Sequence, residues 1–141
     1  MANAPINKPA SDITLLASAA RTATSTGDEI TAIEHYSAAR FSLAVTAASG
    51  TSPTLNVYVQ TKTPSGHWTD LVAFTQKSAA GREHYDHISA TRDPYAEQDA
   101  GLTAGQANDM LLGSRLRVKY VIGGTNPSFT FAVTMVGYAH R

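Results

Sequence analysis

The sequence predicts an all-β protein, an antiparallel β-sandwich of the jelly-roll type with an extended N-terminal arm. Apolar and polar residues alternate with a period of two in several segments, as half-buried strands require. Clusters of Gly, Pro, Ser, Thr and Asn interrupt these segments about every ten residues, and no segment carries a convincing helical pattern. At 141 residues the chain has the length of one domain.

Residues 1–12 are expected to form the arm, and residues 13–141 a single sandwich domain. The arm holds Pro5 and Pro9 and few apolar residues, so it has little to bury on its own domain. Two interpretations of this arm stay open: a free tail, or an extension that becomes ordered on a neighbouring subunit.

The first part of the domain gives weaker signals. Residues 13–17 and 20–25 are expected to be two short strands around a bend, because Thr, Ser and Ala dominate there. Residues 28–38 are expected to be a loop that could include one helical turn, since Asp28 is a suitable capping residue for a piece too short to be a stable helix.

The clearest alternation lies in residues 39–48 and 54–62, which we expect to pair as a hairpin around the turn cluster between them. The turn at 63–66 has Pro second and Gly fourth, as a type I turn favours, and leads into a third strand at 67–76. The side chains expected to point inward are Phe41, Leu43, Val45, Ala47, Leu55, Val57 and Val59.

A second hairpin is expected near the carboxyl end, from residues 115–122 and 129–136, with 123–128 as its loop. Its expected inward side chains are Leu116, Val118, Tyr120, Ile122, Phe129, Phe131, Val133 and Met135. Residues 82–89, rich in His, Glu and Asp, are expected to be an edge strand. Residues 91–109 lack strand periodicity and are expected to be a long loop, either a binding loop or a disordered segment.

The composition excludes several classes of function. Eleven Lys and Arg balance eleven Asp and Glu, so the chain is not a generic binder of nucleic acid or of an acidic membrane. There is no cysteine, which excludes disulfides, iron-sulfur sites and a thiol nucleophile. Charged residues are only 16% of the chain against about 25% in a typical soluble domain, which favours association through weakly polar surfaces.

The motifs of catalysis are also absent, and we expect no enzyme, cofactor or metal. Neither Gly-rich phosphate loops nor the serine elbow occur. The cluster at 83–87 could bring only His84 and Asp86 to one face of a strand, with His87 on the other, which favours a solvated polar edge over a metal site. Asp70 and Glu83 could in principle pair for glycoside hydrolysis, but no pattern singles them out.

Two kinds of surface are candidates for binding another protein. Arg115, Arg117 and Lys119 alternate along one strand and could be either a solvated face or a stripe that docks onto carboxylates of a partner. The outward residues of the second and last strands are weakly polar, which favours self-association. The candidate interface residues are Arg115, Arg117, Lys119, Tyr58, Val136, Tyr138, Tyr95, Pro5 and Pro9.

Three stretches, 13–24, 45–55 and 115–134, resemble the cement, or decoration, proteins of tailed double-stranded DNA bacteriophage capsids. The resemblance covers about half of the chain and consists of strand patterns and turn residues. It implies a jelly-roll-like sandwich that binds the outside of the capsid as a homodimer and bridges neighbouring major capsid proteins. It implies a place in the virion after assembly in the host cytoplasm, with no catalysis and no cofactor. The charge balance separately argues against nucleic acid and membrane as partners.

Two alternatives stay open. The chain could be another virion part, such as a tail or head-completion protein. It could also be a carbohydrate-binding sandwich that uses Trp68, Tyr58 and Tyr95 as stacking platforms, although the pattern favours packing of Trp68 in the core or against a turn.

Overall fold

The computed structural model of the 141-residue chain describes residues 11–88, 96–108 and 110–139, and these are built from strands and loops. All strand pairs are antiparallel, so the predicted all-β antiparallel class is confirmed. The strands are β1 (Ser11–Arg21), β2 (Ser25–Thr26), β3 (Tyr36–Lys62), β4 (Trp68–Ala73), β5 (Gly81–Ile88) and β6 (Leu116–Ala139).

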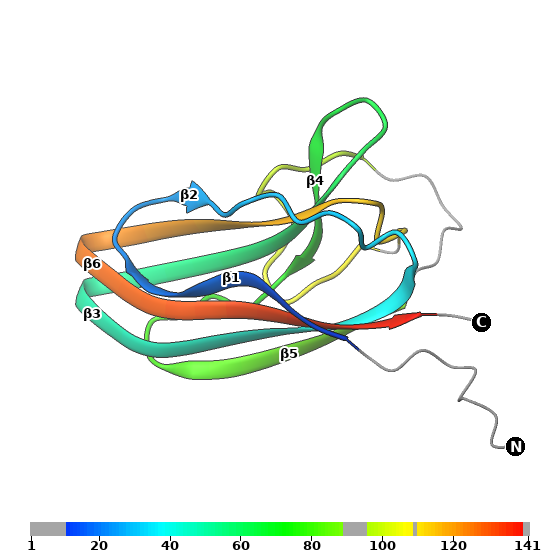
Figure 1. Ribbon diagram of the computed structural model, residues 1–141. Helices are drawn as coiled ribbons and strands as arrows, with labels where there is room; N and C mark the ends of the chain where they lie inside the picture. The colour runs from blue at the N-terminus through cyan, green and yellow to red at the C-terminus, as the bar shows by residue number, and fades with distance from the viewer. Residues whose placement is uncertain (1–10, 89–95, 109, 140–141) are drawn as a thin grey trace, which may run out of the picture.

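Two unusually long strands, β3 and β6, form the frame of the molecule. They pair from Tyr36 opposite Ala139 to Thr61 opposite Leu116, with register shifts near residues 49–54. At those shifts the pair folds over on itself, at the left end of Figure 1, so that each strand contributes one half to each of two layers.

The other strands extend the two layers. In the first layer the order is β1, the second half of β6, the first half of β3, then β5. In the second layer it is β2, the first half of β6, the second half of β3, then β4. This order of half-strands is consistent with the predicted jelly-roll sandwich, which has eight strands in two antiparallel sheets.

The two expected hairpins are wrong, although their strands exist. Residues 39–48 do not pair with 54–62; both pair with β6, and they lie in different layers. Residues 115–122 and 129–136 are likewise successive parts of β6 that pair with β3. A turn cluster marks where a strand changes direction, but the same residues serve a hairpin loop and a corner between two sheets.

The corner is built from two similar sequences, Gly50-Thr51-Ser52-Pro53 in β3 and Gly124-Thr125-Asn126-Pro127 in β6. Gly50 and Gly124 have φ of +113° and +112°, a region that side chains disfavour. A Cβ on Gly50 would lie 2.7 Å from the carbonyl oxygen of Asn126, and one on Gly124 would lie 2.8 Å from that of Ser52. The two strands therefore cross at the corner in backbone contact.

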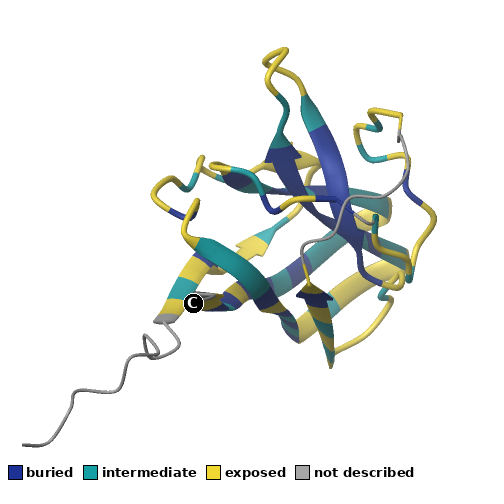
Figure 2. Cartoon of the chain, turned by 90° about the vertical axis from the view of Figure 1, so that its right-hand side faces the viewer, coloured by how far each residue is buried: buried dark blue, intermediate teal, exposed yellow. Residues whose placement is uncertain are grey.

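The core lies between the layers, and the expected inward faces are largely confirmed. Leu43, Val57, Val118 and Phe131 are at most 1% exposed, and they come from both halves of β3 and β6. Ala47 is exposed because a register shift between Val45 and Ala47 turns it outward, opposite Thr130, and Ile122 is half-buried. In Figure 2, β5, which leads into the grey trace, shows the alternation as teal and yellow bands, with one dark blue band near its end.

The outer face of the second layer is covered by residues 96–108, which we call the strap. The strap pairs with the free edge of β4: Ala73 N donates to Gln106 O at 2.8 Å, and Asn108 N donates to Leu71 O at 2.8 Å. The described part of the expected loop 91–109 is therefore an ordered cover on the protein's own sheet. Residues 91–95 and 109 of that loop lie outside the described residues.

The remaining elements differ from expectation in detail. Residues 13–17 and 20–21 belong to one strand, β1, which has two register shifts and begins at Ser11, so it includes the last two residues of the expected arm. The rest of the expected second strand is a connection, residues 22–24, and the first residue of β2. Residues 28–35 form a loop with a bridge from Ile30 to Leu116. The expected turn at 63–66 is confirmed by Gly66 N donating to Thr63 O at 2.9 Å, and β5 lies at the expected sheet edge.

Candidate functional site: an uncovered sheet face

The outer face of the first layer has no cover within the described part of the chain. Antiparallel register places its residues in rows that cross the sheet from strand to strand. One row holds Thr14, Thr134, Ser42 and His84; the next holds Asp12, Val136, Arg40 and Asp86; the outermost holds Tyr138, Ala38 and Ile88. We call these residues, with the row of Ala132, Ala44 and Arg82, the open face.

Small and uncharged side chains form the middle of the open face. Ala132, Thr134, Ser42 and Ala44 lie on its two central strands. Larger apolar groups lie toward one end, where Ile88 is 75% exposed and Tyr138 is 46% exposed. A flat surface of short side chains with apolar groups at one end is easily desolvated by a protein partner.

An ion pair joins β3 and β5 on the open face. The guanidinium of Arg40 donates from Nε to Asp86 Oδ1 at 2.6 Å and from Nη2 to Asp86 Oδ2 at 3.0 Å. These hydrogen bonds lower the pKa of Asp86, with the charge of Arg40 adding to the effect and desolvation opposing it. Beside the pair, Ser42 Oγ and His84 Nδ1 lie 2.8 Å apart, and the four side chains line a shallow depression.

The histidine cluster behaves as the strand pattern predicts. His84 and Asp86 are exposed on the open face, whereas His87 is 5% exposed and its Nε2 lies 2.9 Å from the carbonyl oxygen of Met110. Among the residues that the structure describes, no three His, Asp or Glu side chains come together as a metal site. The described residues also contain no helix that could span a membrane.

The expected docking stripe of Arg115, Arg117 and Lys119 lies on the second layer, and its charges are met by the protein's own carboxylates. Arg115 Nη1 donates to Glu29 Oε1 at 2.7 Å, and Lys119 Nζ donates to Asp99 Oδ1 at 3.0 Å. The hydrogen bond from Arg115 lowers the pKa of Glu29 despite some desolvation. The stripe is therefore part of an internal ionic network.

Arg117 is the most enclosed member of this network. Its Nε donates to Gln60 Oε1 at 2.7 Å, and its guanidinium lies 4.6 Å from the centre of the Trp68 ring. Lys62 also lies over this ring, at 5.7 Å. Trp68 is half-buried and already in contact with two cations, which argues against its use as an open platform for a sugar.

Tyr58 and Gln60 were expected on a weakly polar outer surface, but the strap covers them. Tyr58 is 9% exposed and packs with Ala73 and Leu102, and Gln60 is 0% exposed. Burial raises the pKa of Tyr58, and the charge of Asp70 raises it further. Tyr58 therefore offers little surface to a partner while the strap is in place.

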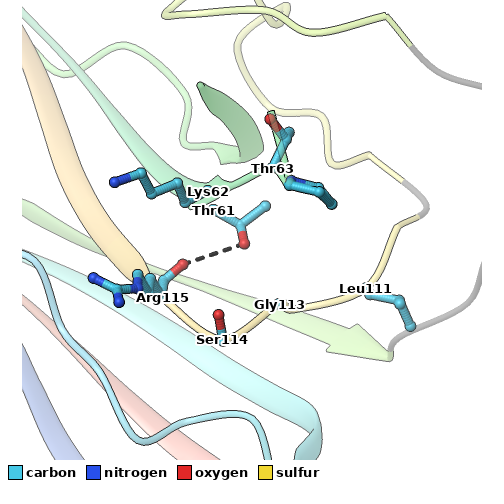
Figure 3. Close-up of a pocket in the computed structure, with 8 residues that line it drawn as sticks. Thr61, Lys62, Thr63, Leu111, Gly113, Ser114 and Arg115 are labelled. Atoms are coloured by element: carbon cyan, nitrogen blue, oxygen red, sulfur yellow. Dashed lines mark hydrogen bonds between the residues drawn. The ribbon is translucent and has the colours of Figure 1, made fainter. Parts of the chain in front are cut away.

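A pocket lies beside the end of β3, between Thr61, Pro64 and residues 111–115 (Figure 3). Thr61 Oγ1 donates to Leu112 O at 2.6 Å and lies 3.2 Å from Arg115 O. Both cationic groups at the pocket contact Glu29 Oε1: Lys62 Nζ lies 4.0 Å and Arg115 Nη1 2.7 Å from it. The rest of the pocket is lined by hydroxyl, backbone and apolar groups.

Val136 and Tyr138 are thus the candidate residues that the structure places on the open face. Pro5, Pro9 and Tyr95 lie outside the described residues. The sequence pattern missed the contribution of β5 and of the outward residues of β3, whose signal is the run of Arg40, Ser42 and Ala44 between inward apolar residues. A scan against protein-family models found no match, and a search of curated proteins found no similar sequence.

Proposed function

We propose that this chain is a non-enzymatic structural protein of a tailed-phage virion, a cement protein that binds the outside of the capsid through its open face and bridges neighbouring major capsid proteins. The observation that carries the proposal is the contrast between the two layers. The strap covers the outer face of one layer, whereas the other presents an uncovered four-stranded face whose two central strands carry mostly small, weakly polar side chains.

The open face suits such a partner in shape and in chemistry. Short side chains on paired strands lose little conformational entropy when a partner covers them, because they have few rotamers to lose. The charges of Arg40 and Asp86 meet each other, so a partner that covers this pair need not neutralise either group. The sequence resemblance to cement proteins points to a capsid as the surface covered.

The mechanics of a capsid shell explain why a cement protein needs no catalytic activity. A protein bound across a joint between two capsid subunits opposes their separation by its own binding free energy. A standard interface buries about 1,600 Å², and an icosahedral shell repeats it at many equivalent joints. A two-layer body whose long strands belong to both layers is a stiff bridge for this purpose.

The test is co-sedimentation of the purified chain with heads of the phage that carries its gene, both before and after their expansion. We expect saturable binding to expanded heads and a higher temperature of head disruption when the chain is bound. Failure to bind either form would overturn the proposal.

A matched pair of variants locates the binding surface. Thr134→Glu places a charge in the middle of the open face, and Thr103→Glu places the same charge on the exposed strap. We expect Thr134→Glu to weaken head binding about tenfold or more, because the new carboxylate loses its hydration in the interface, and Thr103→Glu to bind like the unsubstituted chain. Equal binding by both variants would contradict the assignment to the open face.

A further inference from the structure

The free edges of the two sheets are not equally protected. The edge of β4 is paired with the strap. The ladder of β1 with β6 contains two register shifts, and such irregularities discourage pairing with another chain. By contrast, β5 pairs with β3 through eight consecutive residues without a shift, and the described strands contact it on that side alone. The segment Arg82–Asp86 is thus a regular edge.

Arg82 is distinctive among the cations of the described residues. The other described Arg and Lys side chains contact a carboxylate, a backbone carbonyl or an aromatic ring. Arg82 is exposed on the open face of β5 opposite Ala44, and within the described chain it has no such contact. A guanidinium without a partner on a regular strand edge is placed to meet a carboxylate of another chain.

The outward side chains of this segment are Arg82, His84 and Asp86, a cation and an anion at equal distances on either side of a histidine. When a strand pairs antiparallel with a copy of itself around His84, each Arg82 falls opposite the Asp86 of the other copy. We propose that β5 pairs with β5 of a second copy of this chain, with the two-fold axis at His84 and two Arg82 to Asp86 contacts across the interface.

The charges select this register as well as permit it. A shift of the axis by one residue, to Glu83 or to Tyr85, would place Arg82 opposite His84 or Ile88 instead of opposite a carboxylate. Charged side chains on an edge usually prevent pairing, but here their signs are complementary under the two-fold rotation, as an isologous interface requires. Asp86 also keeps its contact with Arg40, since a carboxylate can accept hydrogen bonds from both guanidinium groups.

Pairing at this edge has a consequence for the shape of the assembly. The two first layers become one continuous eight-stranded sheet, because each contributes β1, β6, β3 and β5 in that order. The two open faces then lie side by side on the same surface. The inference does not depend on the proposed function, because it concerns what the chain does in solution.

The decisive experiment exchanges the charges in two chains. Arg82→Glu places a carboxylate opposite Asp86 of the other copy, and Asp86→Arg places a guanidinium opposite Arg82. We expect the unsubstituted chain to form dimers in sedimentation velocity, and each variant alone to associate about tenfold or more weakly. An equimolar mixture should recover dimers, because both contacts of the mixed pair are again between opposite charges. Native mass spectrometry identifies the mixed pair by its mass.

A covalent test uses the absence of cysteine from the sequence. His84→Cys places one thiol next to its copy at the axis, so mild oxidation should yield a disulfide-linked dimer. The control, Thr134→Cys, lies on the same face two strands further in, and should stay unlinked. Circular dichroism confirms that each variant is folded.

The outcomes separate this inference from the proposed function. A monomeric unsubstituted chain, dimers that persist in Arg82→Glu, a mixture that stays monomeric, or equal cross-linking of the two cysteine variants would each overturn the β5 pairing. A folded monomer that still binds phage heads would overturn the pairing and leave the cement proposal standing. A dimer that binds no heads would do the reverse.

Discussion

Asp70 shows how one buried side chain determines what the surface presents. It is 0% exposed, and its two carboxylate oxygens accept hydrogen bonds from Gln60 Nε2 at 2.9 Å and from the backbone N–H groups of residues 100–102 at 2.8 to 2.9 Å. Four donors satisfy an otherwise costly buried carboxylate. Asp70 therefore fastens the strap to β4, and the strap in turn removes Tyr58 from the surface.

We predict that Asp70→Ala lowers the free energy of unfolding by about 3 kcal/mol or more, because it leaves three backbone N–H groups and an amide without their acceptor. The loss should appear as a lower urea midpoint. The substitution should also accelerate hydrogen exchange at the amides of residues 100–102 more than at those in the core of β3. A stable variant with unchanged exchange at these amides would show that the strap is held by other contacts.

Glu83 is another carboxylate whose partners lie within the protein. Burial raises its pKa, but hydrogen bonds from Lys77 and from Thr75 outweigh that effect, and the net pKa lies below the ordinary value of 4.5. A carboxyl whose pKa is lower in the folded state stabilises the fold above its unfolded pKa. That contribution disappears as the pH falls through the folded pKa.

We therefore predict that the free energy of unfolding falls more steeply between about pH 5 and about pH 3 in the unsubstituted chain than in Glu83→Gln, which has no proton to take up. Glu34→Gln is the matched control, because Glu34 is exposed and has no ion pair within the described chain. Parallel pH profiles for the unsubstituted chain and Glu83→Gln would contradict the role given to Glu83.

At the level of strands, the sequence predicts which side chains point inward but not which strands pair. Alternation identifies the inward side chains of β3 and β6 because it depends on burial on one side of each strand. It does not identify the partner strand, since residues 39–48 alternate in the same way whether they pair with 54–62 or with β6. The corner at Gly50 and the corner at Gly124 looked like two independent hairpin loops, because their contact is visible only in space.

The corner makes a specific prediction about glycine. Gly50→Ala and Gly124→Ala should each lower the free energy of unfolding by about 2 kcal/mol or more, because the new methyl group meets the backbone of the other strand in addition to the cost of a positive φ. Gly66→Ala is the control: its φ is +89°, but a Cβ there would have nothing within 4 Å. Urea denaturation should show a clearly smaller loss for Gly66→Ala, and equal losses would refute the crossing contact.

For the whole molecule, composition shows that positive and negative charges are equal in number, but only the structure shows which of them contact each other. Of the residues expected on weakly polar outer faces, Val136 and Tyr138 lie on an uncovered sheet face, whereas Tyr58 is buried under the strap. The cationic stripe was placed on the right strand, yet its carboxylate partners, Glu29 and Asp99, come from distant loops. Sequence periodicity reports the faces of a strand, but which loop covers a face depends on tertiary contacts.

Because β3 and β6 each run through both layers, we predict that the layers unfold together. Trp68, the single tryptophan, lies in the second layer and reports on it by fluorescence, whereas circular dichroism reports on all strands. Leu43→Ala and Leu55→Ala remove matched core side chains from the first and second layers, at 1% and 0% exposure. Each should cost about 2 to 5 kcal/mol. In each variant, the fluorescence midpoint and the dichroism midpoint in urea should shift by the same amount. If Leu43→Ala moved the dichroism transition while leaving that of Trp68 in place, the layers would be separate folding units and the continuity of β3 and β6 would carry no cooperativity.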